Sequence, residues 1–338
     1  MIIGSILIAS FFASYVLTAW MLRHSRMRQI VDRPNSRSSH STPTPRGGGL
    51  SMVVVTTGGV AILYGTRMIP SPLAIVLVLG GMSIAAVGFW DDVRSAPVAV
   101  RMTVHFGAAV LAVYCLGSPS ALRVGHSIVT LGVFGPVISV LAVVWILNLF
   151  NFMDGIDGIA ASEAVCVLFG AAAIGLFVAR CSLTEVAPAL VIGAACLGFL
   201  RWNWPPAAIF MGDIGSGYLG YAIAVIAIDL AQRSAINIYA WLILGGIFFV
   251  DATLTLCRRL LRGERVSQPH RTHAYQWLAR RWGSHSRVTV TVITINLVWL
   301  LPCAALSVKF PEFSIWICIL ALAPLTVCAY LSGSGRPE

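Results

Sequence analysis

Long apolar segments alternate with short polar ones along the whole chain. A helix that crosses a membrane needs about 20 mainly apolar residues, at a rise of about 1.5 Å per residue. The sequence therefore predicts an all-α polytopic membrane protein, with about eleven transmembrane helices and one integral-membrane domain over residues 1–338. The predicted spans are 2–22, 48–66, 70–90, 103–118, 128–149, 163–180, 187–203, 215–231, 237–257, 288–308 and 312–332.

Composition excludes the main alternative to a membrane protein. Apolar residues make up 58% of the chain and charged residues only 11%, whereas soluble domains average about 45–50% and about 25%. So little charge cannot solvate a surface of this size, which excludes the soluble two-domain enzyme that length alone would allow. The eight cysteines occur singly in apolar stretches without a C-x-x-C pair, which favours packing over metal or redox roles.

Basic residues predict the orientation in the membrane. The formal charge of +10 arises from 22 Arg and one Lys, and with alternating spans 18 of these 23 fall on one side. Because basic loops stay in the cytoplasm, we expect a periplasmic N-terminus and a cytoplasmic C-terminus. Membrane orientation explains the charge, so no nucleic-acid partner is expected. The predicted cytoplasmic loops are 23–47, 91–102, 150–162, 204–214 and 258–287.

Most aspartates share the basic side of the membrane. Asp229 and Asp251 are the exceptions near helix ends, and we expect each to be an interfacial carboxylate with an Arg neighbour. No charged side chain stands clearly at the middle of the bilayer, which argues against a proton-coupled transporter. The aspartates predicted to face the cytoplasm are Asp91, Asp92, Asp154, Asp157 and Asp213.

Two motifs near the first cytoplasmic ends contain groups that bind phosphate. Arg46 precedes three glycines whose backbone N–H groups could approach an anion, although a flexible basic loop fits equally well. Asp91 and Asp92 are adjacent at the end of the third span, and such carboxylates repel unless a cation such as Mg²⁺ joins them. A polar helix end is the alternative. Arg101, nine residues beyond Asp92, could hold a phosphate on the same face.

The segment 148–158 gives the strongest local indication of chemistry. Asn148, Asn151 and Asp154 recur every three residues and therefore share one face at the end of a span. The Asp154-Gly and Asp157-Gly steps that follow unwind the chain. A simple turn would not need two Asn residues inside the preceding apolar helix.

Two later motifs are less specific. Asp213 lies between glycines at the start of a span, where helix N–H groups favour a metal–phosphate complex, although Gly-Asp-x-Gly is often an ordinary turn. The loop 258–287 contains eight Arg, with Arg271 between His270 and His273. On a helix the two His would align, but a zinc site lacks further ligands. A basic segment on anionic lipid is the alternative.

Carboxylates for Mg²⁺ and basic groups for phosphate at one membrane face indicate phosphoryl transfer from a soluble donor to a lipid acceptor. The ordered motifs Pro-Thr-Pro-Arg-Gly-Gly-Gly, Asp-Asp-Val-Arg, Asn-x-x-Asn-x-x-Asp-Gly-x-Asp-Gly, Phe-Met-Gly-Asp-x-Gly-Ser and a late His loop support a more specific hypothesis. They resemble the polyprenyl-phosphate N-acetylaminosugar-1-phosphate transferase family, glycosyltransferase family 4. Within it, the chain looks most similar to the transferases that start O-antigen assembly.

The resemblance implies an activity, a cofactor and a location. The enzyme would transfer an N-acetylaminosugar 1-phosphate from a UDP-N-acetyl sugar to undecaprenyl phosphate, releasing UMP. UDP-GlcNAc, UDP-FucNAc and UDP-QuiNAc are the candidate donors, with Mg²⁺ or Mn²⁺ as cofactor. It would act at the cytoplasmic face of the bacterial inner membrane, as the first membrane step of O-antigen and lipopolysaccharide synthesis. Another cell-surface polysaccharide, a membrane transporter and the formation of a homodimer stay open.

The resemblance also implies roles for individual residues. Asp213 and Asn151 would bind the metal, and the lipid phosphate would attack the β-phosphorus directly. An aspartyl-phosphate intermediate on Asp91 or Asp157 is the alternative. The His-Arg-Thr-His loop departs from the triple-His pattern of other branches. Motifs and resemblance together give the predicted site. The predicted catalytic residues are Asp91, Asp92, Asp154 and Asp157, and those predicted for nucleotide or phosphate are Arg46, Arg101, Asn148, Gly155, Phe210, His270, Arg271 and His273.

Overall fold

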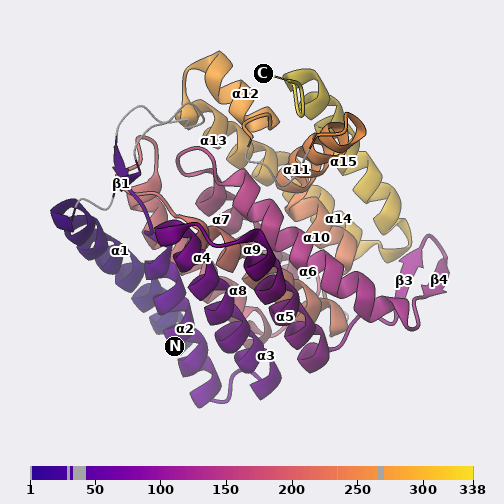
Figure 1. The fold of residues 1–338 in the computed structure, drawn as a ribbon. Helices are drawn as coiled ribbons and strands as arrows, with labels where there is room; N and C mark the ends of the chain where they lie inside the picture. Colours follow the sequence, from indigo (N-terminus) through magenta and orange to yellow (C-terminus); the bar gives the residue numbers. More distant parts are fainter. Residues whose placement is uncertain (1, 29–30, 33–42, 234, 265–269, 338) are drawn as a thin grey trace.

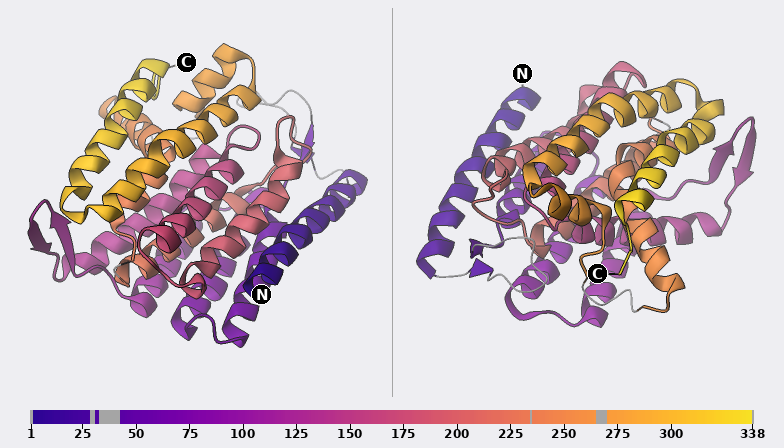
Figure 2. Two further views of the ribbon diagram at one scale, coloured as in Figure 1. Left: turned by 180° about the vertical axis from the view of Figure 1, so that it is seen from behind. Right: turned by 90° about the horizontal axis from the view of Figure 1, so that it is seen from above.

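The regular secondary structure of the described residues is helical apart from two short antiparallel strand pairs, of which one joins Val31–Asp32 (β1) to Thr44–Pro45 (β2). The computed structural model describes residues 2–28, 31–32, 43–233, 235–264 and 270–337. Figures 1 and 2 show long helices packed side by side. The α-helices are α1 (Ile2–Arg28), α2 (Gly49–Gly65), α3 (Ser71–Ile75), α4 (Gly81–Arg94), α5 (Val98–Leu116), α6 (Phe134–Met153), α7 (Ile159–Phe177), α8 (Leu183–Asn203), α9 (Asp213–Gln232), α10 (Ile238–Leu244), α11 (Gly246–Leu261), α12 (Ala274–Trp282), α13 (His285–Ile295), α14 (Leu301–Lys309) and α15 (Ser314–Ser332).

Apolar helices long enough to cross a membrane make up most of the molecule, so this is an all-α polytopic membrane protein. The described residues contain nine such helices, and α10 and α11 together form a tenth apolar segment that is bent by 81°. π-Helical turns at Val76–Gly80 and Asn296–Leu300 join α3 to α4 and α13 to α14 into continuous helices. With α2, a shorter apolar helix, every predicted span has a counterpart. The number of crossings and their orientation stay predictions.

Several predicted boundaries are wrong. The span expected at 128–149 begins only at Phe134, because Ala121–Val124 (β3) and Ser127–Thr130 (β4) form an antiparallel hairpin. Gly125 in its two-residue turn has a φ of +62°, and such a Gly in a two-residue turn is typical of a hairpin. This hairpin projects from the bundle away from α12 (Figure 1).

Two of the predicted loops, 150–162 and 258–287, are shorter than expected because helices extend into them. Helix α6 continues through its polar face to Met153 and α7 begins at Ile159, so the loop predicted at 150–162 is reduced to residues 154–158. Part of the loop predicted at 258–287 is likewise helical, in α12.

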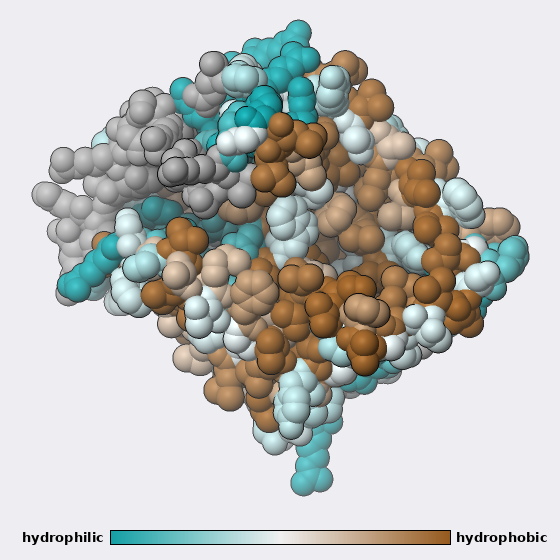
Figure 3. Space-filling model, turned by 45° about the vertical axis from the view of Figure 1, so that its right-hand side comes forward, coloured by the Kyte–Doolittle hydropathy of each residue, from teal (hydrophilic) through white to brown (hydrophobic). Residues whose placement is uncertain are grey.

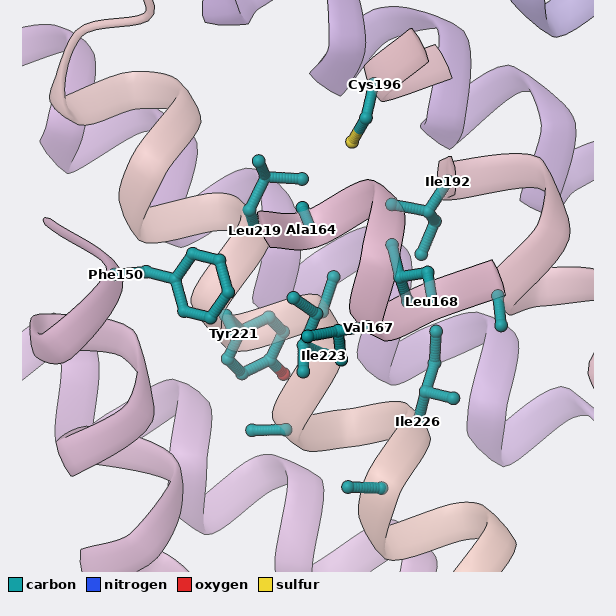
Figure 4. Close-up of a cluster of buried hydrophobic side chains, with 14 of the residues drawn as sticks. Phe150, Ala164, Val167, Leu168, Ile192, Cys196, Leu219, Tyr221, Ile223 and Ile226 are labelled. Atoms are coloured by element: carbon teal, nitrogen blue, oxygen red, sulfur yellow. The ribbon is translucent and has the colours of Figure 1, made fainter. Parts of the chain in front are cut away.

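Helix α9 is the centre of the bundle. Every residue from Ile214 to Leu230 is buried, and the helix packs against both α4 and α6. Figure 4 shows its side chains meeting those of α6, α7 and α8 in a continuous apolar cluster. Gly220 permits the close approach of α9 to α6, since a Cβ there would lie 2.7 Å from Leu147 Cα and 2.8 Å from the Ile146 carbonyl oxygen.

The outer surface is apolar over a wide area. Figure 3 shows hydrophobic side chains covering the middle of one face, with polar ones towards its edges. Phe12 of α1, Tyr114 of α5 and Val298 are among the large apolar residues left exposed. Lipid is the solvent that tolerates such a surface.

We predict that Gly220→Ala destabilises the protein. The added methyl group would meet backbone atoms of α6 that no side-chain rotation can move, and overpacking of this kind typically costs about 1–3 kcal/mol. Thermal unfolding in detergent should show a lower midpoint. Gly107→Ala in α5 is the matched control, because nothing lies within 4 Å of a Cβ there and Ala favours a helix. Equal midpoints for the two variants would contradict this packing.

Candidate active site

A cavity of about 1120 Å³ lies at one end of the bundle, where several helices end and others begin. Its wall contains parts of α4, α5, α6, α9 and α11, together with the segments before α7, α9 and α12 (Figure 1). All but two of the predicted site residues line it. The predicted residues that line the cavity are Arg46, Asp91, Arg101, Asn148, Asn151, Asp154, Gly155, Asp157, Phe210, Asp213, His270 and His273. The exceptions are Asp92 and Arg271.

The segment before α2 reaches the cavity by pairing with the segment before α9. Gly48 N–H donates to the Phe210 carbonyl oxygen (2.9 Å), and Gly49 N–H donates to that of Met211 (2.9 Å). A Cβ on Gly49 would collide with the Gly215 backbone. The prediction of a glycine anion cradle is therefore wrong for these two N–H groups. The glycines instead allow the close packing that places Arg46.

Asp213, the first residue of α9, lies between two arginines. Arg46 Nη2 is 3.1 Å from Asp213 Oδ1, while its Nε is 2.9 Å from Asp92 Oδ1. Arg101 Nη1 forms a short ion pair with Asp91 Oδ2 and lies 3.8 Å from Asp213 Oδ2. Each arginine thus links Asp213 to one member of the Asp91–Asp92 pair. This offsets the repulsion among the three carboxylates.

The adjacent residues Asp91 and Asp92 have different positions and partners. Asp91 lines the cavity and accepts a hydrogen bond from Ala96 N–H (2.7 Å). Asp92 accepts from the N–H groups of Asp213 (2.9 Å) and Ile214 (3.1 Å), and its side chain is 6% exposed. Both Asp92 oxygens therefore satisfy the free N–H groups at the start of α9. Asp92 lies behind the cavity wall and fixes Asp213.

The polar face at the end of α6 points into the same cavity. Asn151 Nδ2 donates to Ser216 Oγ (3.1 Å), and Asn148 Nδ2 donates to the Val144 carbonyl oxygen (2.7 Å). Their amide oxygens are bonded to no described residue. Burial, and after it the negative charge of Asp213, raises the pKa of Asp154 well above its ordinary value. These oxygen atoms lie near Asp213 because α6 packs against α9.

Asp157 is fixed by contacts that the sequence did not indicate. Its Oδ2 accepts from Ala207 N–H (3.1 Å) and lies 3.3 Å from His285 Nδ1. Buried Asn203 holds the loop on its other side, since its Oδ1 accepts from Gly158 N–H (3.1 Å) and its Nδ2 donates to the Ile209 carbonyl oxygen (3.0 Å). His285 lines the cavity as the first residue of α13, where the sequence showed only one more His in a basic loop.

The opposite wall carries His270 and His273. They lie before α12 rather than on a helix, yet their rings stack with centroids 4.9 Å apart, and His273 stacks on Tyr275 at 5.7 Å. Burial, helped by the neighbouring His273 and Arg259, lowers the pKa of His270 to about 3. His270 is therefore a neutral hydrogen-bonding group. Arg271 lies off this wall, and its carbonyl oxygen accepts from Arg280.

The two aspartates that were expected near helix ends, Asp229 and Asp251, have different partners. Asp229 pairs with Arg233, directly after the end of α9 (3.0 Å), which confirms the predicted Arg neighbour. Asp251 is buried in α11 and accepts from the N–H groups of Ala274 (2.8 Å) and Tyr275 (3.1 Å). The prediction of an interfacial carboxylate paired with Arg is therefore wrong for Asp251, which holds the start of α12.

The oxygen-rich side of the cavity is suited to a hard divalent cation. Among the described residues, no group of three or more His, Cys, Asp or Glu is arranged to hold a metal alone. Mg²⁺ in phosphoryl-transfer sites usually takes one or two carboxylates and completes its shell with water and phosphate oxygens. The Asp213 carboxylate and the Asn151 amide oxygen fit that requirement.

The other side of the cavity is apolar and reaches the outer surface. Met102, Val144 and Trp145 form part of this wall between α5 and α6. Val98 at the start of α5 and Leu141 in α6 also line the cavity, yet they are 47% and 53% exposed. The cavity is therefore open to the surface that lipid would cover. These apolar residues are indistinguishable from ordinary span residues in the sequence.

Comparison with known proteins identifies relatives over most of the chain. The family model "Glycosyl transferase family 4" matches residues 74–231, which contain the aspartates on the cavity wall. The chain is 27% identical over 338 residues to "Probable undecaprenyl-phosphate N-acetylglucosaminyl 1-phosphate transferase" of Bacillus subtilis, covering 96% of this chain and 91% of that protein. It is 28% identical over 300 residues to "Decaprenyl-phosphate N-acetylglucosaminephosphotransferase" of Mycobacterium tuberculosis, covering 78% and 72%. It is 31% identical over 278 residues to "Phospho-N-acetylmuramoyl-pentapeptide-transferase" of Frankia alni, covering 69% and 76%.

We predict that Asp92→Asn destabilises the protein while Asp213→Asn does not. Asp92 now accepts hydrogen bonds from two backbone N–H groups, and an Asn at position 92 would place its NH₂ group against one of them. That N–H group would lose its acceptor, and a buried unpaired N–H costs about 1–3 kcal/mol. Removing the Asp213 charge relieves repulsion from its neighbours, so thermal unfolding of that variant should stay close to wild type. An Asp92→Asn variant with an unchanged unfolding midpoint would show that Asp92 does not cap α9.

Proposed function

Because the chain belongs to glycosyl transferase family 4, we propose that it transfers an N-acetylaminosugar 1-phosphate from a UDP-sugar to a polyprenyl phosphate, releasing UMP. The observation that carries this proposal is the cavity, where carboxylates and arginines adjoin an apolar wall open to the lipid-facing surface. A water-soluble nucleotide and an isoprenoid lipid can react only at a site that is accessible both from water and from the lipid bilayer.

The polar side of the cavity would bind the nucleotide sugar. Arg46 and Arg101 lie on either side of Asp213, within reach of a diphosphate bound beside it. Gly155 and Phe210, with the neutral His270, line the region proposed for the uridine and sugar. Neutral hydrogen-bonding groups suit a base or sugar hydroxyl, whereas the arginines suit phosphate oxygens.

The apolar opening between α5 and α6 would admit the lipid. Its phosphate would enter beside Arg101, with the first isoprene units against Met102, Leu141 and Trp145. An acceptor bound there keeps its chain in the bilayer while its phosphate reaches the diphosphate. This arrangement supports a multi-pass enzyme of the bacterial inner membrane, with the cavity facing the cytoplasm.

We favour direct attack by the lipid phosphate. A phosphate monoester with a second pKa of about 6 is largely dianionic at neutral pH, so a strong base is dispensable. Its oxygen would form a bond to the β-phosphorus while the bond to the bridging oxygen breaks and UMP leaves. Arg46 and Arg101 would stabilise charge on the phosphoryl oxygens. Asp213 and Asn151 would hold a Mg²⁺ or Mn²⁺ ion, which neutralises diphosphate charge when bound.

We predict that purified protein releases UMP only when a UDP-N-acetyl sugar, Mg²⁺ and undecaprenyl phosphate are all present. Asp213→Asn should lower kcat by about 10²–10³, as expected when the cation that would stabilise transition-state charge is no longer held in place. Asp229→Asn, at the far end of α9, is the matched control and should keep wild-type activity. A panel of UDP-GlcNAc, UDP-FucNAc and UDP-QuiNAc reports the preferred sugar. Folded protein that releases no UMP from any of them would reject the proposal.

The two reaction routes make different predictions without the lipid. Direct transfer predicts that labelled UMP does not exchange into the UDP-sugar when polyprenyl phosphate has been removed completely. An aspartyl-phosphate intermediate on Asp91 or Asp157 would allow that exchange, because UMP would leave before the acceptor binds. Exchange that persists in lipid-free protein, and disappears in Asp157→Asn or Asp91→Asn, would replace the direct route.

The sugar that the enzyme transfers would indicate which polysaccharide pathway it serves. We propose O-antigen initiation, on the motif resemblance, with another cell-surface polysaccharide as the alternative. The relatives from Bacillus subtilis and Mycobacterium tuberculosis are named for N-acetylglucosamine and the one from Frankia alni for N-acetylmuramoyl-pentapeptide. The His270–His273 wall is the part of the cavity where a different sugar would find different partners.

A further inference from the structure

Asp251 connects three separate parts of the chain. It lies in α11, after the sharp bend that follows α10, and is only 4% exposed. Besides the N–H groups of Ala274 and Tyr275, its carboxylate accepts from Ser334 Oγ (2.8 Å) and Thr255 Oγ1 (3.2 Å). A buried carboxylate is costly unless such donors surround it. Asp251 therefore anchors the start of α12 to α11 and to the segment after α15.

The segment after α15 also supports the part of the cavity wall formed by His270 and His273, called the His wall below. Gly335 N–H donates to the Thr272 carbonyl oxygen (2.7 Å), between His270 and His273. Arg258 Nη1 donates to the Ser334 carbonyl oxygen (2.6 Å), which ties this segment to α11 as well. The backbone is thus held on both sides of His273, at Thr272 by the segment after α15 and at Ala274 and Tyr275 by Asp251.

Tyr275 extends this support to the loop at Gly155 from behind the cavity wall. Its hydroxyl donates to the Phe152 carbonyl oxygen (3.0 Å), at the end of α6. A Cβ on Gly155 would collide with that hydroxyl, so the Tyr275 side chain packs directly on the Gly155 backbone. Burial, with the negative charges of Asp251 and Asp154, raises the pKa of Tyr275 well above its ordinary value, which keeps the hydroxyl a donor.

We propose that Asp251 and Tyr275 are positioning residues for the nucleotide site, which together set the separation between the His wall and the loop at Gly155. Asp251 fixes the backbone of Tyr275, and Tyr275 spans from α12 to the end of α6. The inference rests on the proposed function, in which Gly155, His270 and His273 contact the nucleotide sugar. Tyr275 itself is absent from the cavity wall, so it acts through these residues.

The position of this support predicts which substrate it affects. The apolar opening proposed for the lipid is formed by α5 and α6 residues, among them Met102 and Leu141, and neither Asp251 nor Tyr275 contributes to it. Loosening the His wall should therefore weaken the binding of the nucleotide and leave the affinity for the polyprenyl phosphate unchanged. A residue needed only for folding would instead lower the amount of active enzyme, with both KM values unchanged.

The test compares Tyr275→Phe and Asp251→Asn with matched controls. Tyr275→Phe removes one hydrogen bond and keeps the ring, and we expect the Kd for UDP, measured by titration calorimetry without lipid, to rise about 3–10-fold. Asp251→Asn disturbs several bonds and should raise it about 10–100-fold, with a parallel rise in KM for the UDP-sugar. KM for undecaprenyl phosphate should stay within about twofold. Tyr239→Phe, which loses an equivalent bond to the Arg123 carbonyl oxygen, and Asp229→Asn are the controls.

Each contrary outcome has one meaning. Wild-type protein that fails to bind UDP would reject the proposed function, whatever the variants do. Wild-type protein that binds UDP, with folded variants that bind it equally well, would overturn the positioning role. A fall in kcat with unchanged Kd and KM values would overturn it too. If Asp251→Asn does not fold, Tyr275→Phe decides the question, because it alone cuts the link to Phe152.

Discussion

The site depends on balancing negative charge at the start of a buried helix. Helix α9 occupies the centre of an apolar bundle, and its first residue, Asp213, must be tolerated beside two other carboxylates. Arg46 and Arg101 reach it from separate parts of the chain, and Asp92 satisfies the N–H groups on which it stands. Arg46 also pairs with Asp92 and Arg101 with Asp91, so the charges around Asp213 are balanced as a group, whereas loss of Asp92 leaves N–H groups of α9 without their acceptor. The packing around α9 and the chemistry of the cavity are therefore set by the same contacts.

Sequence reasoning found the parts of this site that lie at helix ends. Polar residues inside or just after apolar spans are conspicuous, because a span has few reasons to carry them. Asn148, Asn151 and Asp154 were found by their three-residue spacing, and α6 indeed continues far enough to place the first two on one face of a helix. The basic and acidic motifs could be assigned to one end of the bundle because alternating spans leave only two choices.

The sequence does not show which backbone N–H groups donate hydrogen bonds to each carboxylate. Asp91 and Asp92 are neighbours of equal composition, yet one lines the cavity and the other caps α9 from behind. Asp251 has the sequence context of an interfacial carboxylate, but the bend between α10 and α11 turns it towards α12. These roles arise from contacts between residues far apart in the chain. No local pattern encodes them, and the glycines that allow such close contacts resemble any others in a span.

Different interactions support the two sides of the cavity. The acidic side is built on helix ends that pack in the core, where α6 and α9 approach each other at Gly220. The His side is built on a loop that is held by hydrogen bonds to Asp251 and to the segment after α15. Close-packed helices resist displacement, whereas a hydrogen-bonded loop can be moved at smaller cost. In the function proposed above, the groups assigned to the phosphates are thus held by packed helices, and the wall assigned to the nucleotide sugar is held by hydrogen bonds, so this wall is the part that sequence changes can alter at the smaller cost.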